Sequence, residues 1–220
     1  MERQAEPELM DEGEQARAYA FADFETPHEY FIELFKQYFP NDTIDGDVLD
    51  LGCGPADVII RFAKHFPDCA ILGIDGADAM LKYGKKAIDE AQLSHRIHLQ
   101  KAHLPHTQIP QRNYQVIMSN SLLHHLDNPL SLWKVIKNYA QSGTRIFIMD
   151  LMRPRSQSAA GDLVEEYAGN EPDILKRDFY QSLLAAYTVG EVEEQLERER
   201  LLDLIVKPVS DRHLIVTGVW

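Results

Sequence analysis

The residues in this sequence that are best able to do chemistry are two aspartates placed around a pair of glycines. Residues 48–57 read VLDLGCGPAD, an apolar strand pattern that runs into a glycine turn and then a helix. Glycine lets the backbone approach a ligand closely, and the start of a helix offers unpaired amides. Asp50 lies two residues before Gly52, and Asp75 follows Gly54 by 21 residues. This spacing predicts a nucleoside-binding turn with two carboxylates beside it.

The positions of the carboxylates indicate which nucleoside would bind. Asp75, at the end of the second predicted strand, can accept hydrogen bonds from both ribose hydroxyls. Asp50 would lie where a dinucleotide places its pyrophosphate, and it would repel a phosphate but attract an ammonium or sulfonium group. Asp57 occupies the place of the third glycine in the dinucleotide fingerprint. The pattern favours a cationic nucleoside over NAD, although a tight strand-to-helix turn without a ligand would also explain the glycines.

These residues need a parallel sheet covered by helices on both faces to position them. The chain alternates short β-branched runs with segments of helical period, which is typical of that α/β arrangement. One helical segment follows Asn128 and Pro129, which can begin a helix. The predicted strands are Asp47–Leu51, Ala70–Ile74, Arg96–Gln100, Tyr114–Ser119 and Arg145–Asp150.

Further segments are predicted before and after this core. Thr26 to Glu29 reads as a capping box that begins a helix ahead of the sheet. Residues 1–15 are acidic and poor in apolar side chains, so we expect them to be disordered or a mobile flap. Residues 151–178 show no clear period and suit a lid-like insertion after the fifth strand. The apolar runs Leu201–Val206 and His213–Trp220 suit an antiparallel pair.

Three segments together resemble the successive signatures of class I S-adenosylmethionine-dependent methyltransferases. They are DLGCG at residues 50–54, GIDG at 73–76 and SNSLLHH at 119–125, in the family's order and at predicted strand ends. The resemblance is strong over roughly residues 44–150. It implies a Rossmann-like, doubly wound, seven-stranded sheet in a three-layer αβα sandwich, with the last strand antiparallel.

The resemblance also implies a division of the chain and a cofactor. Residues 1–43 would form an N-terminal helical flap or cap, and residues 44–220 the methyltransferase domain. S-adenosylmethionine would be the cofactor, with the glycines along its methionine part, Asp50 orienting its amino group and Asp75 holding its ribose. The cofactor-binding residues implied in this way are Asp50, Gly52, Gly54, Asp75, Gly76, Met80, Ala102, His103 and Asn120.

Two of these positions carry a second interpretation. Met80 would pack near the adenine, but it could equally be a core residue of its helix. The family usually has an acid followed by alanine after the third strand, whereas this chain has Lys101 before Ala102. The contact to the adenine amino group would then fall to His103 or to a backbone group.

The chemistry itself requires few fixed residues. Methyl transfer from a sulfonium is an in-line displacement, so alignment supplies much of the rate, and a base is needed only for a protonated acceptor. His125 is the candidate general base, ahead of its neighbour His124. Arg153 could contact a substrate carboxylate, or form an ordinary ion pair. Tyr19 could close over the site as a lid, or pack as a helix aromatic.

Charge and composition exclude several classes of function. The net charge is −13, from 35 acids against 22 Lys and Arg, so the composition gives no excess of positive charge that would bind a nucleic-acid backbone. No apolar run is long enough to span a bilayer, and the polar start does not read as a secretion signal. Cys53 and Cys69 are expected to be reduced thiols. We therefore expect a cytoplasmic protein, a monomer or homodimer, without a membrane partner, and a nucleic-acid partner is disfavoured.

A bound metal ion is not predicted from the sequence. His98, His103 and His106 lie close together along the chain, but this segment passes from a strand into a loop. It also lacks a carboxylate or thiolate partner, and a good site needs three or four convergent ligands.

The sequence thus predicts a methyltransferase that acts on an oxygen, nitrogen or sulfur atom of a small-molecule metabolite. The alternatives are a tRNA or protein methyltransferase and a non-catalytic module that keeps the cofactor pocket. Asn120 is followed by Ser-Leu-Leu instead of the Asn-Pro-Pro-aromatic run of amino-methylating nucleic-acid enzymes. Asp50 and Asp57 argue against an NAD-dependent oxidoreductase.

Overall fold

A seven-stranded sheet forms the centre of the computed structural model, which describes residues 1–6, 13–22, 24–105 and 108–220. Its strands are β1 (Asp47–Leu51), β2 (Ala70–Asp75), β3 (Ile97–Lys101), β4 (Tyr114–Asn120), β5 (Arg145–Leu151), β6 (Ile205–Pro208) and β7 (His213–Val219). Their order is β3-β2-β1-β4-β5-β7-β6. The first five strands are parallel, and β7 runs antiparallel to both β5 and β6. This confirms the predicted Rossmann-like sheet with its antiparallel last strand.

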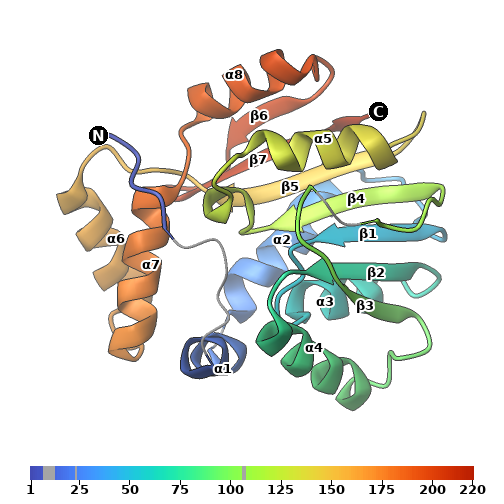
Figure 1. The fold of residues 1–220 in the computed structure, drawn as a ribbon, viewed down its shortest axis with the longest axis horizontal. Helices are drawn as coiled ribbons and strands as arrows, with labels where there is room; N and C mark the ends of the chain where they lie inside the picture. Colours follow the sequence, from blue (N-terminus) through green and yellow to red (C-terminus); the bar gives the residue numbers. More distant parts are fainter. Residues whose placement is uncertain (7–12, 23, 106–107) are drawn as a thin grey trace.

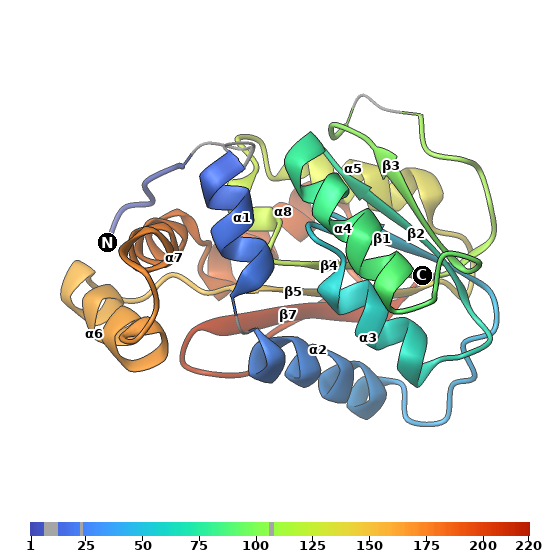
Figure 2. The ribbon, with the colours of Figure 1, turned by 90° about the horizontal axis from the view of Figure 1, so that it is seen from below.

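Helices cover both faces of this sheet (Figures 1 and 2). Successive side chains of a strand point to opposite faces, so Val48 packs with one helical layer and Leu49 with the other. The layer that meets Val48 contains α2 (Glu25–Tyr38), α3 (Asp57–His65) and α4 (Asp78–Glu90). The layer that meets Leu49 contains α5 (Leu130–Tyr139) and α8 (Val189–Glu199). The three-layer sandwich is therefore confirmed.

Three further helices gather beyond the carboxyl ends of the parallel strands (Figures 1 and 2). They are α1 (Gly13–Phe21), α6 (Gln157–Ala168) and α7 (Asp173–Ala185). In this arrangement α1 packs against α4 and α7, and α6 packs against α7. Ligands of open α/β sheets bind at this end, so these helices lie where they can enclose a site.

The segment 151–178, expected to lack a regular period, is mostly helical. Ser156 caps α6 by accepting a hydrogen bond from the Ala159 amide at 3.1 Å. The buried side chains of α6 are only Ala160 and Ala168, so this helix has no apolar stripe of the usual width. The helical period was hidden because α6 lies at the margin of the fold and buries little. The division of the chain at residue 43 and the lid role of this segment stay predictions.

The ends of two other elements differ from the sequence prediction. The capping box at Thr26 is wrong: α2 begins at Glu25, and Phe24 occupies the cap position without a side-chain hydrogen bond. The strand predicted from Leu201 begins only at Ile205. Leu201 is buried in a turn against the α5 and α8 layer, so its apolar character reflects core packing and not strand pairing.

Two other local predictions have a clear outcome. Pro129 occupies the cap position of α5, and Asn128 just before it supports the start of the helix, because its side-chain oxygen accepts a hydrogen bond from the Leu130 amide at 3.1 Å. Residues 1–6, expected to be disordered or a flap, lie against α7 and the short 3-10 helix η1 (Leu123–His125). Arg3 holds them there by donating to the carbonyls of Ala185 at 2.6 Å and His124 at 2.8 Å. Residues 7–12 of the same predicted flap lie outside the described residues.

Candidate active site

The glycine turn between β1 and α3 requires glycine at two positions, for different reasons. Gly52 and Gly54 have φ angles of 77° and 51°, in the left-handed region that other residues avoid. A Cβ on Gly52 would lie 2.8 Å from Leu122 Cδ1, which is closer than real Cβ contacts. A Cβ on Gly54 would meet nothing within 4 Å. Gly54 therefore leaves open a cradle that a ligand can approach.

Asp75 connects this turn to the start of α4. Its Oδ2 accepts a hydrogen bond from the Gly54 amide at 2.9 Å, and its Oδ1 accepts one from the Ala77 amide at 2.8 Å. Asp75 lines the pocket beside the glycine turn, as the prediction of a ribose-binding carboxylate requires.

Asp50 lies deeper in the same pocket and is only 2% exposed. Its Oδ1 accepts no hydrogen bond from any described residue. Burial, and then the nearby charge of Asp75, raise the pKa of Asp50 to about 8. A buried carboxylate without a partner is costly, and a cation placed beside it would remove that cost. The pocket therefore fits the charge of a ligand that carries an ammonium or sulfonium group.

The raised pKa of Asp50 predicts a pH-dependent affinity for S-adenosylmethionine or its demethylated product, S-adenosylhomocysteine. Below about pH 8 much of Asp50 is neutral, and a bound ammonium group would favour its ionised form. Affinity should rise with pH between 6 and 7.5, by up to about tenfold per pH unit, because binding then releases one proton. Calorimetric titrations with S-adenosylhomocysteine at several pH values measure this slope.

Asp50→Asn is the matched variant for this measurement, because it keeps the shape and removes the titration. The variant should bind more weakly and with a flat pH profile over the same range. A group whose folded-state pKa is raised loses its contribution to stability as pH rises through that pKa. The unliganded wild type should therefore lose stability from about pH 4 to about pH 8 relative to the variant. Equal slopes for the two proteins would show that Asp50 does not face the ligand.

The structure brings together all the cofactor-binding residues that the sequence predicts. Met80 is buried and also belongs to a small apolar cluster with Ala16 and Tyr19. Its position is therefore compatible both with packing near the adenine and with a core role in its helix. The Ala102 amide donates to the Asp75 carbonyl at 2.9 Å, which fixes the end of β3 beside the end of β2. The residues that line one pocket are Asp50, Gly52, Gly54, Asp75, Gly76, Met80, Ala102, His103 and Asn120.

His28 and Asp57 are among the lining residues that were not predicted as part of the pocket. His28 Nδ1 lies 2.6 Å from Asp57 Oδ2, and Arg61 Nε donates to the same oxygen at 2.8 Å. Burial raises the pKa of Asp57, but His28 and Arg61 outweigh this effect and lower it. Asp57 is therefore a charged anchor between α2 and α3 at the pocket wall. The sequence contained no sign of this pairing, because His28 comes from a separate helix.

A second cavity of about 390 Å³ adjoins the pocket. The two share Tyr19, His28, Asn120, Ser121 and His125, and side chains of α6 and α7 line the far side of the cavity. The predicted lid residue and the predicted base therefore both lie at the junction. Burial raises the pKa of Tyr19 to about 12, so its phenol is neutral at physiological pH.

Arg153 is not brought into either cavity. Its Nη1 donates to the Ala186 carbonyl at 3.2 Å, and its Nη2 donates to Glu191 Oε1 at 2.6 Å. The side chain is buried in these contacts, which tie the end of β5 to the start of α8. The structural interpretation of Arg153, an ion pair, fits its position, and a substrate contact does not.

His124 is held by a buried carboxylate. Its Nδ1 lies 2.6 Å from Asp150 Oδ1, and Asp150 also accepts hydrogen bonds from the amides of Leu123 and Leu151. The His124 side chain is only 2% exposed, and burial alone would lower its pKa. The negative charges of Asp150 and Glu6 outweigh burial and raise the pKa above its ordinary value. His124 is therefore a fixed group whose outer nitrogen faces Glu6.

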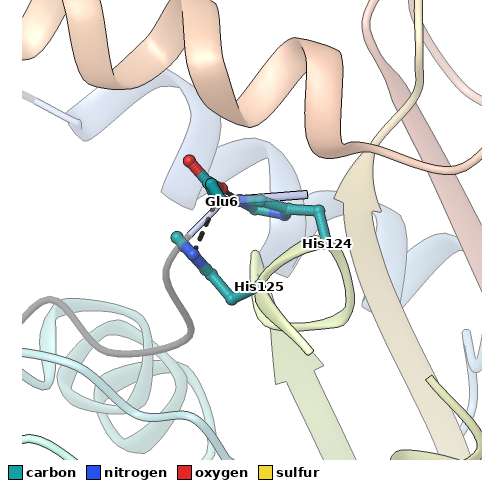
Figure 3. Close-up of side chains that lie close together, drawn as sticks. All are labelled: Glu6, His124 and His125. Carbon is teal, nitrogen blue, oxygen red and sulfur yellow. Dashed lines mark ion pairs between the residues drawn. The ribbon is translucent and has the colours of Figure 1, made fainter. Parts of the chain in front are cut away.

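Glu6 is the residue of this region that the sequence did not single out. Figure 3 shows its carboxylate beside the two histidine rings. Glu6 Oε1 lies 3.2 Å from His125 Nδ1 and 3.6 Å from His124 Nε2. Burial raises the pKa of Glu6. Its neighbours in the sequence are polar and acidic, so no local pattern could reveal that it is placed here.

The remaining sequence predictions concern metal ligands and thiols. His103 lines the pocket, whereas His106 lies outside the described residues. Cys53 and Cys69 are free and buried, as expected. Burial raises the pKa of both thiols, so neither is an activated nucleophile. In the described ranges of the chain, no helix combines the length and apolar character needed to traverse a bilayer.

Comparison with known proteins agrees with this geometry. Residues 48–143, from β1 to the turn that follows α5, match the family model described as a methyltransferase domain. An uncharacterized methyltransferase of Schizosaccharomyces pombe is 20% identical over 133 residues. The match covers 58% of this chain and 45% of that protein, so the chain spans about half the length of this relative.

Solved structures of similar fold cover nearly the whole chain. The plantazolicin methyltransferase BpumL, solved in complex with a triazolic desmethylPZN analog and SAH, has a TM-score of 0.68 and 17% identity. That similarity covers 94% of this chain and 92% of BpumL. A SAM-dependent methyltransferase from Aquifex aeolicus has a TM-score of 0.68 and 16% identity, over 94% of this chain and 97% of that one. These similarities show the fold.

Proposed function

We propose that this chain is a class I S-adenosylmethionine-dependent methyltransferase and that it methylates an oxygen, nitrogen or sulfur atom of a small-molecule metabolite. The observation that carries the proposal is the glycine turn with its two carboxylates. Asp50 lies buried with one oxygen unpaired, and Asp75 lies beside the open cradle at Gly54. When bound there, the cofactor supplies a methyl group on a positively charged sulfur, which makes it electrophilic.

The residues of the chain then have separable tasks. Gly52 and Gly54 allow close approach of the cofactor, Asp75 holds its ribose hydroxyls, and Asp50 attracts its amino group. The adjoining cavity of about 390 Å³ falls in the size range of small-molecule sites. It positions the acceptor, and α1, α6 and α7 exclude water from it.

His125 is the side chain that we expect to meet the acceptor. It lines both cavities, next to Asn120 at the end of β4. An acceptor that carries a proton needs a group that favours loss of this proton, and imidazole does so near neutral pH. An acceptor atom that is nucleophilic without losing a proton needs no base, and only has to be aligned with the methyl group.

The cofactor assignment is tested by calorimetry with the full chain. S-adenosylmethionine and S-adenosylhomocysteine should bind, and NAD should not. A metabolite extract incubated with the protein and cofactor carrying a labelled methyl group then identifies the acceptor. Binding of NAD in preference to both nucleosides would remove the proposal, and tight cofactor binding without transfer to any extract would favour a non-catalytic module.

His125→Gln tests the role of this residue once an acceptor is known. Turnover should fall by about 100-fold or more, because general acid–base catalysis contributes roughly that much. The affinity for S-adenosylhomocysteine should change by less than the turnover does. His95→Gln, at an exposed position, is the control and should leave both quantities unchanged. Unchanged turnover in His125→Gln would assign this histidine to packing.

A further inference from the structure

Glu6, His124 and His125 present a set of metal-ligating atoms at the wall of the second cavity. Each offers one such atom, and these atoms all lie within 4.8 Å of one another. The two histidines line the cavity, and Glu6 reaches them from the N-terminal residues. We propose that these three side chains bind a divalent transition-metal ion such as Zn²⁺. This set is separate from the histidines around His103 that the sequence analysis rejected as a metal site.

The spacing of the three ligand atoms fits one shared metal ion better than direct hydrogen bonds between the side chains. Ligands about 2.1 Å from a tetrahedral zinc ion lie about 3.4 Å from one another. The measured separations from Glu6 Oε1 are 3.2 Å to His125 Nδ1 and 3.6 Å to His124 Nε2. A direct charge-assisted hydrogen bond would be shorter, about 2.7–2.9 Å. Glu6 Oε1 is buried and accepts no hydrogen bond from the described residues.

Asp150 supplies the outer contact that metal-binding histidines usually have. It lies 2.6 Å from His124 Nδ1 and is itself fixed by the amides of Leu123 and Leu151. A histidine that donates its Nδ1 proton to a carboxylate presents Nε2 as a lone pair, oriented for a metal ion. The contact with Asp150 therefore orients the His124 ring so that its Nε2 can bind a metal ion on the side that faces Glu6.

The local charges also favour a cation. The side chains of Glu6 and Asp150 are both nearly buried, and Asp178 and Asp150 add to the negative potential at Glu6. Arg3 lies close by, but its guanidinium donates to backbone carbonyls and stacks on Tyr187. A divalent ion would balance the two buried carboxylates directly.

The donor set also indicates the kind of ion and its use. Two imidazole nitrogens and one carboxylate suit zinc and similar first-row metals, whereas Mg²⁺ and Ca²⁺ prefer oxygen ligands. Three protein ligands leave a coordination position open, as in catalytic zinc sites. An acceptor oxygen, nitrogen or sulfur in the cavity would occupy that position, and the ion would then favour loss of the acceptor's proton in place of His125, whose single lone pair would be used in binding the ion. This last role rests on the proposed methyl transfer, but metal binding itself does not.

The experiment measures binding of the metal alone. The full-length protein is treated with a chelator, dialysed, and titrated calorimetrically with Zn²⁺, and with Co²⁺ to record its visible absorption. We expect one equivalent of Zn²⁺, a Co²⁺ spectrum of low coordination number, and no comparable binding of Mg²⁺. Glu6→Gln and His125→Gln should each weaken Zn²⁺ binding by more than the roughly 100-fold that loss of an outer partner can cost.

Controls separate this site from surface histidines and from the proposed function. His95→Gln removes an exposed histidine and should leave Zn²⁺ affinity unchanged. Circular dichroism shows whether each variant is folded, and because Glu6 and His125 lie on separate segments, the two variants test the site independently. Absence of stoichiometric Zn²⁺ binding, or equal binding by both variants and wild type, would overturn the site. Titration of the same metal-free samples with S-adenosylhomocysteine tests the cofactor pocket separately.

Discussion

Asp75→Ala should weaken binding of S-adenosylhomocysteine by about 5- to 150-fold, or about 1–3 kcal/mol, with the chain still folded. The carboxylate is the group that we assign to the ribose hydroxyls, and hydrogen bonds to a charged acceptor are stronger than neutral ones. The alanine also leaves the Gly54 and Ala77 amides without their acceptor, so the turn loses part of its support. Calorimetric affinity and denaturant unfolding should be measured on the same preparation.

Two further variants separate the ribose contact from the support of the turn. Asp75→Asn keeps one carbonyl oxygen and removes the charge, so it should bind with intermediate affinity. Asp78→Asn removes a carboxylate from the first turn of α4 that is exposed and paired with Lys101. It should leave the affinity unchanged within about twofold, since exposed pairs contribute little. An Asp75→Ala protein that binds like the wild type would mean that the ribose lies elsewhere.

The second large effect is expected from Gly52→Ala. The added Cβ would lie 2.8 Å from Leu122 Cδ1, and the φ of 77° is costly for any residue with a Cβ. Left-handed backbone costs about 1–2 kcal/mol and overpacking about 1–3 kcal/mol, so the free energy of unfolding should fall by about 2–5 kcal/mol. Leu122 lines the pocket, so its displacement should also weaken cofactor binding. Denaturant unfolding and calorimetry measure the two losses.

Gly54 and Gly143 provide matched controls for this result. Both have positive φ, 51° and 91°, and in neither would a Cβ meet an atom within 4 Å. Gly143→Ala should therefore show the cost of backbone strain alone, with normal cofactor affinity. Gly54→Ala should show a similar loss of stability, but its methyl group would enter the cradle and weaken binding. Normal affinity in Gly54→Ala would place the ligand away from the turn.

The parts of the molecule that sequence reasoning predicted are those that depend on local pattern. The strands from Asp47 to Leu51 and from Tyr114 to Ser119 were found because buried parallel strands require continuous apolar runs of that length. The glycine turn and Asp75 were found because a ligand approached by backbone needs small residues at fixed places after a strand. The pocket that joins them follows from the strand order, since their carboxyl ends meet at one edge.

The parts that sequence reasoning missed depend on contacts between distant segments. Glu6 is near His124 only because Arg3 and the Gln4 amide bind carbonyls around the end of α7. Arg153 follows a strand that ends at the pocket, but its guanidinium turns to Glu191 on another helix. A residue's type and spacing cannot show which of several neighbouring partners it will meet. For this reason the cofactor side of the site was predictable, and the acceptor side was not.

The helix α1 contacts elements that line both cavities. It packs against α4, which carries the pocket residue Met80, and against α7, which carries the cavity residue Asp178. If the ligand of one cavity favours one position of α1, it changes the affinity of the other cavity for its own ligand by some factor. Thermodynamic reciprocity requires the second ligand to change the affinity of the first by the same factor. One helix can therefore make two substrates bind cooperatively and couple the departure of one product to that of the other.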